Sequence, residues 1–270
     1  MSELRDKTAI VTGAGRMGSI GHATALALAR EGVNVVVTGT GRDPTTFPEE
    51  EKAAGWQDID SVAAEVCRFG AKALALIVDV RDPDAVEALV ARATRELGGV
   101  DILVNNAAAA KGDDRVPFVD LDNELWRKIM DVNLTGAYYA AKYVARQMIG
   151  QGRGGRIINI SSINGQRALA NTGAYAVSKG AIIDLNRYFA IELAPHGINV
   201  NCVAPGITAT SRIADVVEEV RQSPELLREI PLGRLGTSAE IAEAVLFFAD
   251  GRSSYITGQT LNVDGGVWMD

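Results

Sequence analysis

Short apolar runs alternate with longer segments of helical periodicity along the whole chain. The runs are apolar at successive positions, which is typical of strands covered by helices on both faces. They are TAIVTG (from Thr8), VNVVVT (from Val33), KALALIVD (from Lys72), DILVNN (from Asp101), GRIINIS (from Gly155), INVNCVAP (from Ile198) and QTLNVDG (from Gln259). The helical segments cover 20–30, 59–69, 83–97, 123–149, 173–193 and 238–249. This alternation predicts an α/β fold, doubly wound, with a seven-stranded and mostly parallel sheet.

No linker, repeat or shift of composition divides the chain, so we expect one domain over residues 1–270. Two connections are longer than a compact α/β unit needs, and such loops are often functional. They span 39–58 and about 207–236. We expect the second to be an inserted substrate loop. Its mixture of apolar and charged residues fits a lid and an amphipathic surface helix equally well.

The charge balance narrows the choice of partner. The formal net charge is -7 and the sequence pI is near 5.0, so neither nucleic acid nor an anionic membrane is an expected partner.

No run approaches the roughly 18 apolar residues that span a bilayer, and the N-terminus lacks the apolar stretch of a signal peptide. Cys67 and Cys202 form neither a disulfide framework nor a metal-binding pattern. We therefore expect a cytoplasmic protein without a metal that acts on small molecules.

The turn after the first apolar run has the composition of a phosphate-binding loop. Gly13, Gly15 and Gly18 match GxGxxG between a strand and a helix. Glycine is needed there because a Cβ would hold the backbone away from a pyrophosphate, which the N–H groups of the following helix attract. A tight turn without a ligand is the alternative. The position favours a dinucleotide-binding turn.

A second set of residues carries proton-transfer chemistry. Tyr175 and Lys179 are four positions apart on a predicted helix, so they share one face. An ammonium group near a phenol stabilises the phenolate, which suits the phenol to act as a general base or acid. Ser162, at the end of a predicted strand, would hydrogen-bond the substrate oxygen and hold it in place. Each residue alone has a structural explanation, such as a surface Tyr–Lys pair, but their occurrence together favours catalysis.

These motifs resemble the short-chain dehydrogenase/reductase family, and within it the 3-oxoacyl-ACP-reductase-like branch. The resemblance rests on Thr12-Gly13, Asn105-Asn106-Ala107, the Ser162/Tyr175/Lys179 set and Pro205-Gly206, and it covers essentially the whole chain. It implies a Rossmann fold and an NAD(P)-dependent oxidoreductase acting on CH–OH donors. Such an enzyme moves a hydride between nicotinamide and a secondary alcohol or ketone. The resemblance also implies a homotetramer or homodimer.

The motifs and the resemblance together assign residues to each role. The catalytic set is Asn133, Ser162, Tyr175 and Lys179, with Tyr175 as general acid and base and Asn133 in a water-linked proton path to the lysine. The cofactor set is Gly13, Gly15, Arg16, Ser19, Ile20, Thr40, Arg42, Asp79, Val80, Asn106, Ala107, Ala108, Tyr175, Lys179, Pro205, Gly206, Ile207 and Thr208. The substrate set is Ser162, Asn164, Gln166 and Tyr175.

The chain departs from the family pattern at two places. The stretch between Thr12 and the start of the first helix is about two residues longer than TGxxxGxG, with Ser19 in place of the middle glycine. Ala108 replaces the glycine of NNAG. The longer turn leaves open which residues contact the pyrophosphate, and we expect Gly13, Arg16, Ser19 and Ile20 to do so. We expect the methyl group of Ala108 to alter cofactor packing slightly without abolishing binding.

The end of the second strand bears on the choice between NAD and NADP. An acidic residue there would bind the ribose hydroxyls of NAD, and a basic residue would favour the 2′-phosphate of NADP. The usual acidic position holds Gly39, followed by Thr40 and Arg42, so the sequence favours NADP over NAD. In the alternative interpretation Arg42 is a solvated surface residue and Asp43 accepts the ribose.

Two other functions remain open at this point. A 3-oxoacyl-thioester reductase of the fatty-acid type would use the same catalytic residues. A non-catalytic cofactor-sensing protein is the third possibility, and the intact catalytic set argues against it.

Overall fold

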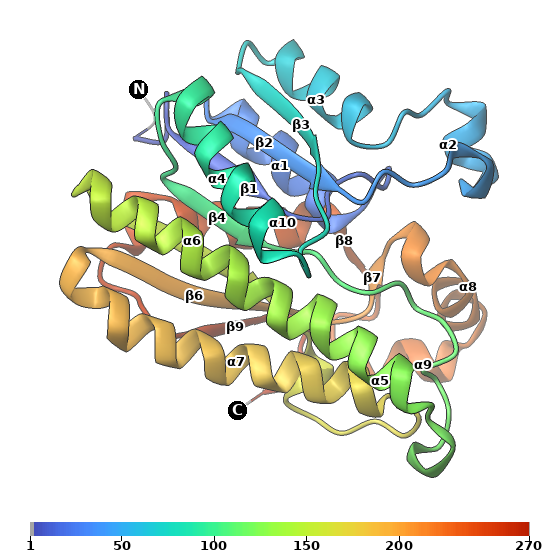
Figure 1. The fold of residues 1–270 in the computed structure, drawn as a ribbon. Coiled ribbons are helices and arrows are strands. Elements are labelled where there is room, and N and C mark those ends of the chain that lie inside the picture. Colours follow the sequence, from blue (N-terminus) through green and yellow to red (C-terminus); the bar gives the residue numbers. More distant parts are fainter. Residues whose placement is uncertain (1–2, 270) are drawn as a thin grey trace.

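Seven parallel strands form the central sheet within residues 3–269, the range that this computed structural model describes (Figure 1). Their order is β3-β2-β1-β4-β5-β6-β9. The strands are β1 (Thr8–Val11), β2 (Asn34–Gly39), β3 (Ala73–Ile77), β4 (Ile102–Asn105), β5 (Gly155–Ile160), β6 (Ile198–Pro205) and β9 (Thr260–Val263). All seven predicted strands and the doubly wound fold are confirmed. The ends of the predicted domain, residues 1, 2 and 270, lie outside the described residues, as do the side chains of 212, 215, 219 and 221.

Helices cover both faces of this sheet (Figure 1). They are α1 (Ile20–Arg30), α2 (Glu49–Ala53), α3 (Ile59–Arg68), α4 (Pro83–Leu97), α5 (Asn123–Met130), α6 (Gly136–Gln151), α7 (Gly173–Leu193), α8 (Ala214–Gln222), α9 (Pro224–Arg228) and α10 (Ser238–Ala249). Helix α4 begins as its sequence predicts, because Asp82 accepts hydrogen bonds from the first-turn backbone and Pro83 occupies a position that needs no donor.

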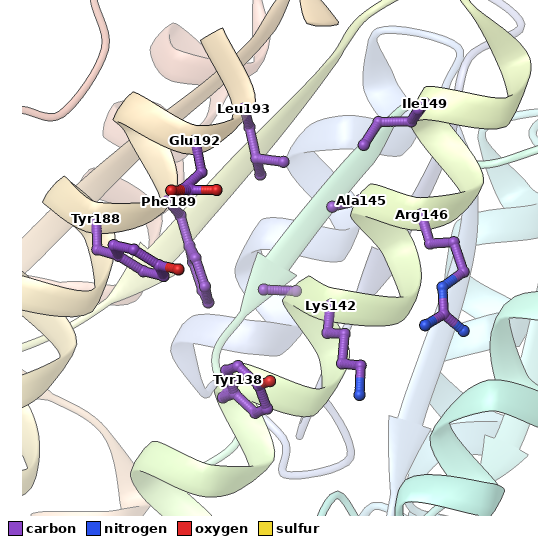
Figure 2. Close-up of a pocket in the computed structure, with 10 residues that line it drawn as sticks. Tyr138, Lys142, Ala145, Arg146, Ile149, Tyr188, Phe189, Glu192 and Leu193 are labelled. Carbon is purple, nitrogen blue, oxygen red and sulfur yellow. The ribbon is translucent and has the colours of Figure 1, made fainter. Parts of the chain in front are cut away.

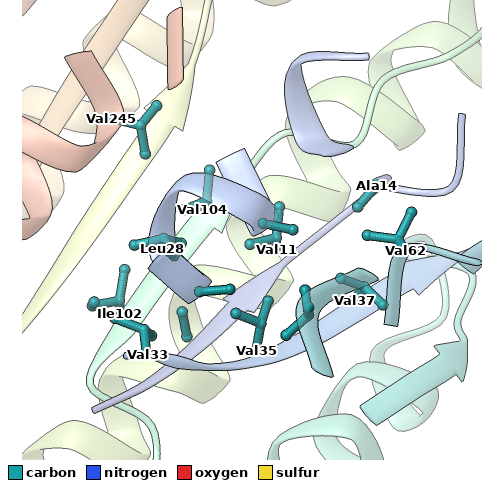
Figure 3. Close-up of a cluster of buried hydrophobic side chains, with 14 of the residues drawn as sticks. Val11, Ala14, Leu28, Val33, Val35, Val37, Val62, Ile102, Val104 and Val245 are labelled. Carbon is teal, nitrogen blue, oxygen red and sulfur yellow. The ribbon is translucent and has the colours of Figure 1, made fainter. Parts of the chain in front are cut away.

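Alternate residues of each strand enter two separate apolar cores. Val35 and Val37 of β2 pack with α1, α3 and α10, as the cluster in Figure 3 shows. Val36, between them, faces the opposite core with α4, α6 and α7. Side chains alternate across a pleated strand, so a strand covered on both sides must be apolar at every position. This requirement explains the continuous apolar runs of the sequence.

The structure differs from the predicted helices at one point. The segment 123–149, predicted as one helix, consists of α5, a π-helical turn at Asp131–Thr135, and α6. A π-helical turn accommodates an extra residue in the helix and often marks a functional site. Apolar periodicity alone does not reveal it, because the apolar stripe continues across the turn.

The two long connections contain short elements of their own. Residues 39–58 include a 3₁₀ turn at Pro44–Thr46 and helix α2. Residues 207–236 carry α8 and α9, and a two-stranded parallel sheet of β7 (Thr208–Ala209) and β8 (Gly236–Thr237) joins the ends of this segment.

None of the helices formed by the described residues combines the length and apolar character needed to cross a bilayer.

Candidate functional site

A cavity of about 500 Å³ opens beyond the carboxyl ends of β4, β5 and β6. Open parallel sheets bind ligands at this edge, near the point where the strand order reverses. Predicted site residues that line it are Ile20, Asn106, Ala108, Ser162, Asn164, Tyr175, Lys179, Pro205, Gly206, Ile207 and Thr208. The structure therefore brings together residues that are far apart in the sequence.

The turns after β1 and β4 are bonded directly to each other. Thr12 Oγ1 accepts hydrogen bonds of 3.0 Å from the backbone N–H groups of Asn106 and Ala107. The Asn106 side chain donates back to the carbonyls of Thr12 and Gly13. A Cβ on Gly13, whose φ is +67°, would lie 2.7 Å from the Ala107 Cα, so this close approach requires glycine. These contacts fix the glycine turn against the strand end that borders the cavity.

Tyr175 and Lys179 lie on the first turns of α7, facing the cavity. The Lys179 side chain is only 3% exposed, and its Nζ donates a 2.7 Å hydrogen bond to the carbonyl of Ile160 at the end of β5. Nζ is 5.9 Å from the centre of the Tyr175 ring. The predicted placement of a cation one helical turn from the phenol agrees with this geometry.

Ser162 reaches the cavity because the short turn after β5 packs tightly on α7. A Cβ on Gly165 would lie 2.6 Å from the carbonyl carbon of Lys179, so only glycine allows this approach. Ser161 Oγ also donates to the Lys179 carbonyl at 2.7 Å. Ser162 is buried, and its Oγ accepts from the Asn164 N–H at 3.2 Å. The sequence analysis did not identify Gly165 or Ser161, whose contacts only the fold brings about.

Asn133 occupies the π-helical turn and is 1% exposed. Its Oδ1 accepts from the Ala109 N–H at 2.8 Å, and its Nδ2 donates to Ser178 Oγ at 2.9 Å. Ser178 Oγ in turn donates to the Tyr175 carbonyl at 2.7 Å. Asn133 therefore ties the loop after β4 to the helix that carries the tyrosine. Its predicted part in a proton path stays a prediction.

The phosphate-binding turn has the features that a pyrophosphate requires. Ser19 is the N-cap of α1, and its hydroxyl accepts a hydrogen bond from the His22 N–H. Because α1 begins directly after the turn, the positive end of its dipole faces the turn. Gly18 has a φ of +67° and open space where a Cβ would stand. The residues present fit a dinucleotide.

The connection 39–58 is fastened onto this turn by polar contacts. Glu51 Oε1 accepts from the Met17 N–H at 2.9 Å, and Trp56 Nε1 donates to the Gly15 carbonyl at 2.7 Å. Arg42 donates to Glu51 and Asp58, with shortest distances of 2.8 Å to each. Burial alone would lower the pKa of Arg42, but the hydrogen bonds to these carboxylates outweigh it and raise that pKa above its ordinary value. Arg42 is thus a partly buried ion-pair partner and not a solvated surface residue.

Other predicted residues lie outside the lining of the cavity. Asp79 pairs with Arg81 at 2.6 Å, and the hydrogen bond from Arg81 lowers the pKa of Asp79. Gln166 donates to Asn262 of β9. Residues in turns or at their edges are Gly13, Gly15, Arg16, Ser19, Thr40, Val80 and Ala107.

The structure adds cationic residues that the sequence analysis missed. Lys111, Arg115 and Arg167 all line the cavity, and Glu229 is an acidic residue on its wall. The Arg115 guanidinium lies 4.7 Å from the centre of the Tyr175 ring. Lys111 and Arg115 lie in the loop after β4, and Arg167 lies in the loop after β5. Neither loop has a periodic pattern, so the sequence offers no signal for these three positions.

A second, shallower hollow lies between α6 and α7, away from the strand ends (Figure 2). Tyr138 and Ile149 of α6 face Tyr188 and Phe189 of α7 across it. Three of these four side chains are exposed apolar or aromatic groups, and none belongs to the predicted catalytic set. This hollow is a surface groove and not part of the candidate site.

Comparison with known proteins finds relatives over the whole chain. A family profile described as enoyl-(acyl carrier protein) reductase matches residues 13–268. L-rhamnose 1-dehydrogenase (NAD(P)(+)) of Azotobacter vinelandii is 39% identical, covering 99% of this chain and 98% of that protein. The 3-oxoacyl-[acyl-carrier-protein] reductase of Synechocystis is 38% identical over the full length of both. The crystal structure of carveol dehydrogenase from Mycobacterium avium in complex with NAD superposes with a TM-score of 0.88 at 29% identity, covering 99% of each chain.

Proposed function

Because the chain belongs to the short-chain dehydrogenase/reductase family and is an NAD(P)-dependent oxidoreductase of CH–OH groups, we propose that Tyr175 transfers the proton in this reaction. The observation that carries the proposal is the convergence of Ser162, Tyr175 and Lys179 on one cavity from β5 and α7. Intact catalytic residues argue against a non-catalytic sensor.

The proton chemistry follows from the environment of the phenol. In alcohol oxidation Tyr175 accepts the substrate hydroxyl proton, and in ketone reduction it returns a proton to the carbonyl oxygen. The buried Lys179 ammonium, held by the Ile160 carbonyl, stabilises the phenolate during each transfer. Ser162 hydrogen-bonds the substrate oxygen, and Asn133 holds the tyrosine helix in register with the loop after β4.

The turn and strand ends hold the dinucleotide. The turn before α1 would bind the pyrophosphate at the positive end of that helix, through backbone N–H groups other than those of Met17 and Gly18, which donate to Glu51 and His22. The segment from Pro205 to Thr208 lines the cavity and would contact the nicotinamide. When bound, the nicotinamide ring supplies or accepts the hydride.

The substrate enters under the segment 207–236, which we assign as a lid within a single domain. Ile213, Val216, Val220, Leu226 and Ile230 of this segment line the cavity. The paired strands β7 and β8 close its base, so α8 and α9 can move as one unit. Gln166 is engaged with Asn262, which leaves Asn164 as the better placed polar contact of the two.

A secondary alcohol such as a sugar or polyol is the first candidate substrate, and a 3-oxoacyl thioester is the second. The first is favoured by the polar groups around Ser162 and by the relative named as a rhamnose dehydrogenase. The second is favoured by the family profile and the Synechocystis relative. The deciding experiment follows nicotinamide absorbance with both cofactors against sugars, polyols, simple ketones and acyl thioesters. If the protein turned over none of these substrate classes, that result would contradict the proposed reaction.

The proposal also covers the oligomeric state of the protein and its cellular compartment. We assign a homotetramer or homodimer formed through the groove between α6 and α7, where Tyr138, Ile149 and Tyr188 expose apolar surface. The free thiols of Cys67 and Cys202 suit a reducing, cytoplasmic compartment. Light scattering after gel filtration measures the mass. A monomer over the micromolar range would contradict the assembly.

A further inference from the structure

Positive charge gathers in the cavity although the protein as a whole is acidic. The formal net charge of the chain is -7. Among the described residues, four basic side chains line the cavity, those of Lys111, Arg115, Arg167 and Lys179. Glu229 is the one acidic residue of this described lining, and it is exposed. An excess of one charge in a cleft concentrates ligands of the opposite charge, so the cavity favours an anion.

Arg115 lies directly beside the catalytic tyrosine. Its guanidinium carbon stands over the Tyr175 ring at 4.7 Å from the ring centre, closer than Lys179 Nζ at 5.9 Å. The side chain is 25% exposed, and its Nε lies 3.7 Å from Asp114 Oδ2, beyond hydrogen-bond distance. Its Nη1, which is buried, has no hydrogen-bond partner in the described part of the chain, and no other guanidinium nitrogen donates one there. The protein therefore holds this cation without using its N–H donors.

Arg167 reaches the same cavity from the loop that carries Ser162. It is half-buried, and its side chain makes neither a hydrogen bond nor an ion pair with the described residues. Its backbone N–H donates to the Ile163 carbonyl at 2.9 Å, which fixes its backbone to the short turn after Ser162. A half-buried guanidinium without an acidic partner is costly because it loses hydration without compensation. An anionic ligand would remove that cost.

Both arginines belong to the substrate end of the cavity. Arg115 contacts the phenol of Tyr175, and Arg167 follows Ser162 in one loop. These two catalytic groups hold the reacting oxygen of the substrate, whereas the cofactor phosphates have their own site at the turn before α1. A planar guanidinium matches two oxygens of a carboxylate or a phosphate group. The unused donors are therefore placed to bind such a group close to the reacting carbon.

We propose that the substrate of this enzyme is a hydroxy or oxo compound that carries a carboxylate or phosphate group, which Arg115 and Arg167 bind beside Tyr175. The proposal rests on the proposed function and narrows its substrates from alcohols and ketones in general to anionic ones. Lys111 adds a further positive charge to the cavity. The reaction is unchanged, since the alcohol carbon gives its hydride to the nicotinamide and the hydroxyl gives its proton to Tyr175. The anionic group takes no part in that step.

The test compares kcat/KM for three compounds with a similar six-carbon hydroxyl chain, namely sorbitol, gluconate and sorbitol 6-phosphate. Sorbitol is neutral, and the other two separate a carboxylate from a phosphate as the source of the charge. A shorter pair, 3-hydroxybutanoate and 2-butanol, repeats the comparison on a smaller skeleton. Each compound is oxidised with NAD⁺ and with NADP⁺. We expect at least one anion to exceed its neutral partner by about tenfold or more, since a hydrogen bond to a charged group changes affinity by about tenfold to a hundredfold.

Substitution of the arginines assigns the preference to them. Arg115→Gln and Arg167→Gln remove the charge and keep a polar side chain. Each should lower kcat/KM for the preferred anion by about tenfold, mainly through KM, and leave that of the neutral partner within about threefold. Arg92→Gln, on α4 and outside the cavity lining, removes one charge elsewhere and is the matched control that should change neither value. The affinity for NAD⁺, measured by calorimetry, should stay within about twofold in all three variants.

Each outcome decides the proposal. A wild-type kcat/KM for the neutral compounds equal to or above that for the anions would overturn it, even if an arginine variant failed to fold. Equal losses for neutral and anionic substrates in the arginine variants, or a parallel loss of NAD⁺ affinity, would also overturn it. Reduction of the neutral acetoacetyl thioester of N-acetylcysteamine without turnover of any anion would do the same. If no compound were turned over, that result would instead contradict the proposed function.

Discussion

The catalytic corner and the nucleotide corner of this site are built in different ways. In the catalytic corner, Tyr175 and Lys179 lie on α7, and Ser162 lies in the short turn after β5 that packs backbone against backbone on this helix, as the approach of Gly165 shows. In the nucleotide corner, ion pairs and side-chain hydrogen bonds hold the loop 39–58 onto the glycine turn. The difference teaches that regular spacing places the catalytic side chains, whereas side-chain pairing between distant residues fixes the path of the loop beside the glycine turn.

The largest expected effect tests the catalytic corner. Tyr175→Phe removes the hydroxyl that moves the proton, so kcat should fall by about 10²- to 10⁴-fold while dinucleotide affinity stays within about twofold. Steady-state kinetics and calorimetry measure the two quantities. Tyr188→Phe, an exposed tyrosine on the same helix, is the control and should retain full turnover. Retention of wild-type kcat by the Tyr175 variant would show that another group transfers the proton.

The second prediction tests the ion pairs of the nucleotide corner. Glu51 is 1% exposed and binds both Arg42 and the Met17 N–H. Glu51→Ala leaves Arg42 with one carboxylate and a backbone donor without its acceptor, which should lower the free energy of unfolding by about 3 kcal/mol. Urea unfolding measures this loss. Glu50→Ala, at an exposed neighbouring position, should change it by less than about 0.5 kcal/mol, and equal losses in both would refute the assigned pairing.

The sequence predicted the parts of the molecule that rest on periodicity. Strand and helix segments follow from apolar repeats, and Tyr175 and Lys179 follow from a spacing of four on one helix. The π-helical turn at Asn133 was missed because one extra residue per turn leaves the apolar stripe almost unchanged.

The nucleotide loop was not predictable on the same grounds. Pattern reasoning located an acidic or basic residue by its distance from β2 along the chain, which pointed to Gly39, Thr40 and Arg42. In the structure, the Asp58 carboxylate lies against Gly15 and Gly39. The loop that brings it there follows a path that depends on the contacts of Trp56 and Glu51 with the glycine turn. Such contacts between residues far apart in sequence leave no periodic trace.

A third and smaller effect tests the backbone packing of the catalytic corner. Gly165→Ala places a Cβ 2.6 Å from the Lys179 carbonyl carbon, so the turn must move away from α7 and displace Ser162. Overpacking of this kind costs about 1–3 kcal/mol, and we expect kcat/KM to fall about tenfold. Gly150→Ala, at a helical position with open space, should leave kcat/KM unchanged and stabilise the helix by about 0.5–1 kcal/mol. A Gly165 variant with wild-type kcat/KM would contradict the role of this contact.

The smallest effect compares a buried thiol beside the catalytic corner with an exposed one. Cys202 lies in β6, and burial raises its pKa to about 12, whereas Cys67 is exposed in the last turn of α3. A thiol with that pKa is thiolate to only about one part in 10⁴ at pH 8, and its burial also blocks access. A disulfide reagent at pH 8 should therefore modify Cys67 alone in the native protein and both thiols in urea. The Cys202 thiolate becomes abundant only as the pH rises toward the raised pKa, so native labelling should stay at one thiol across neutral and mildly alkaline pH. Rapid native labelling of Cys202 would mean that the sheet opens at its catalytic edge, and the rigid packing that we assign to the catalytic corner would be wrong.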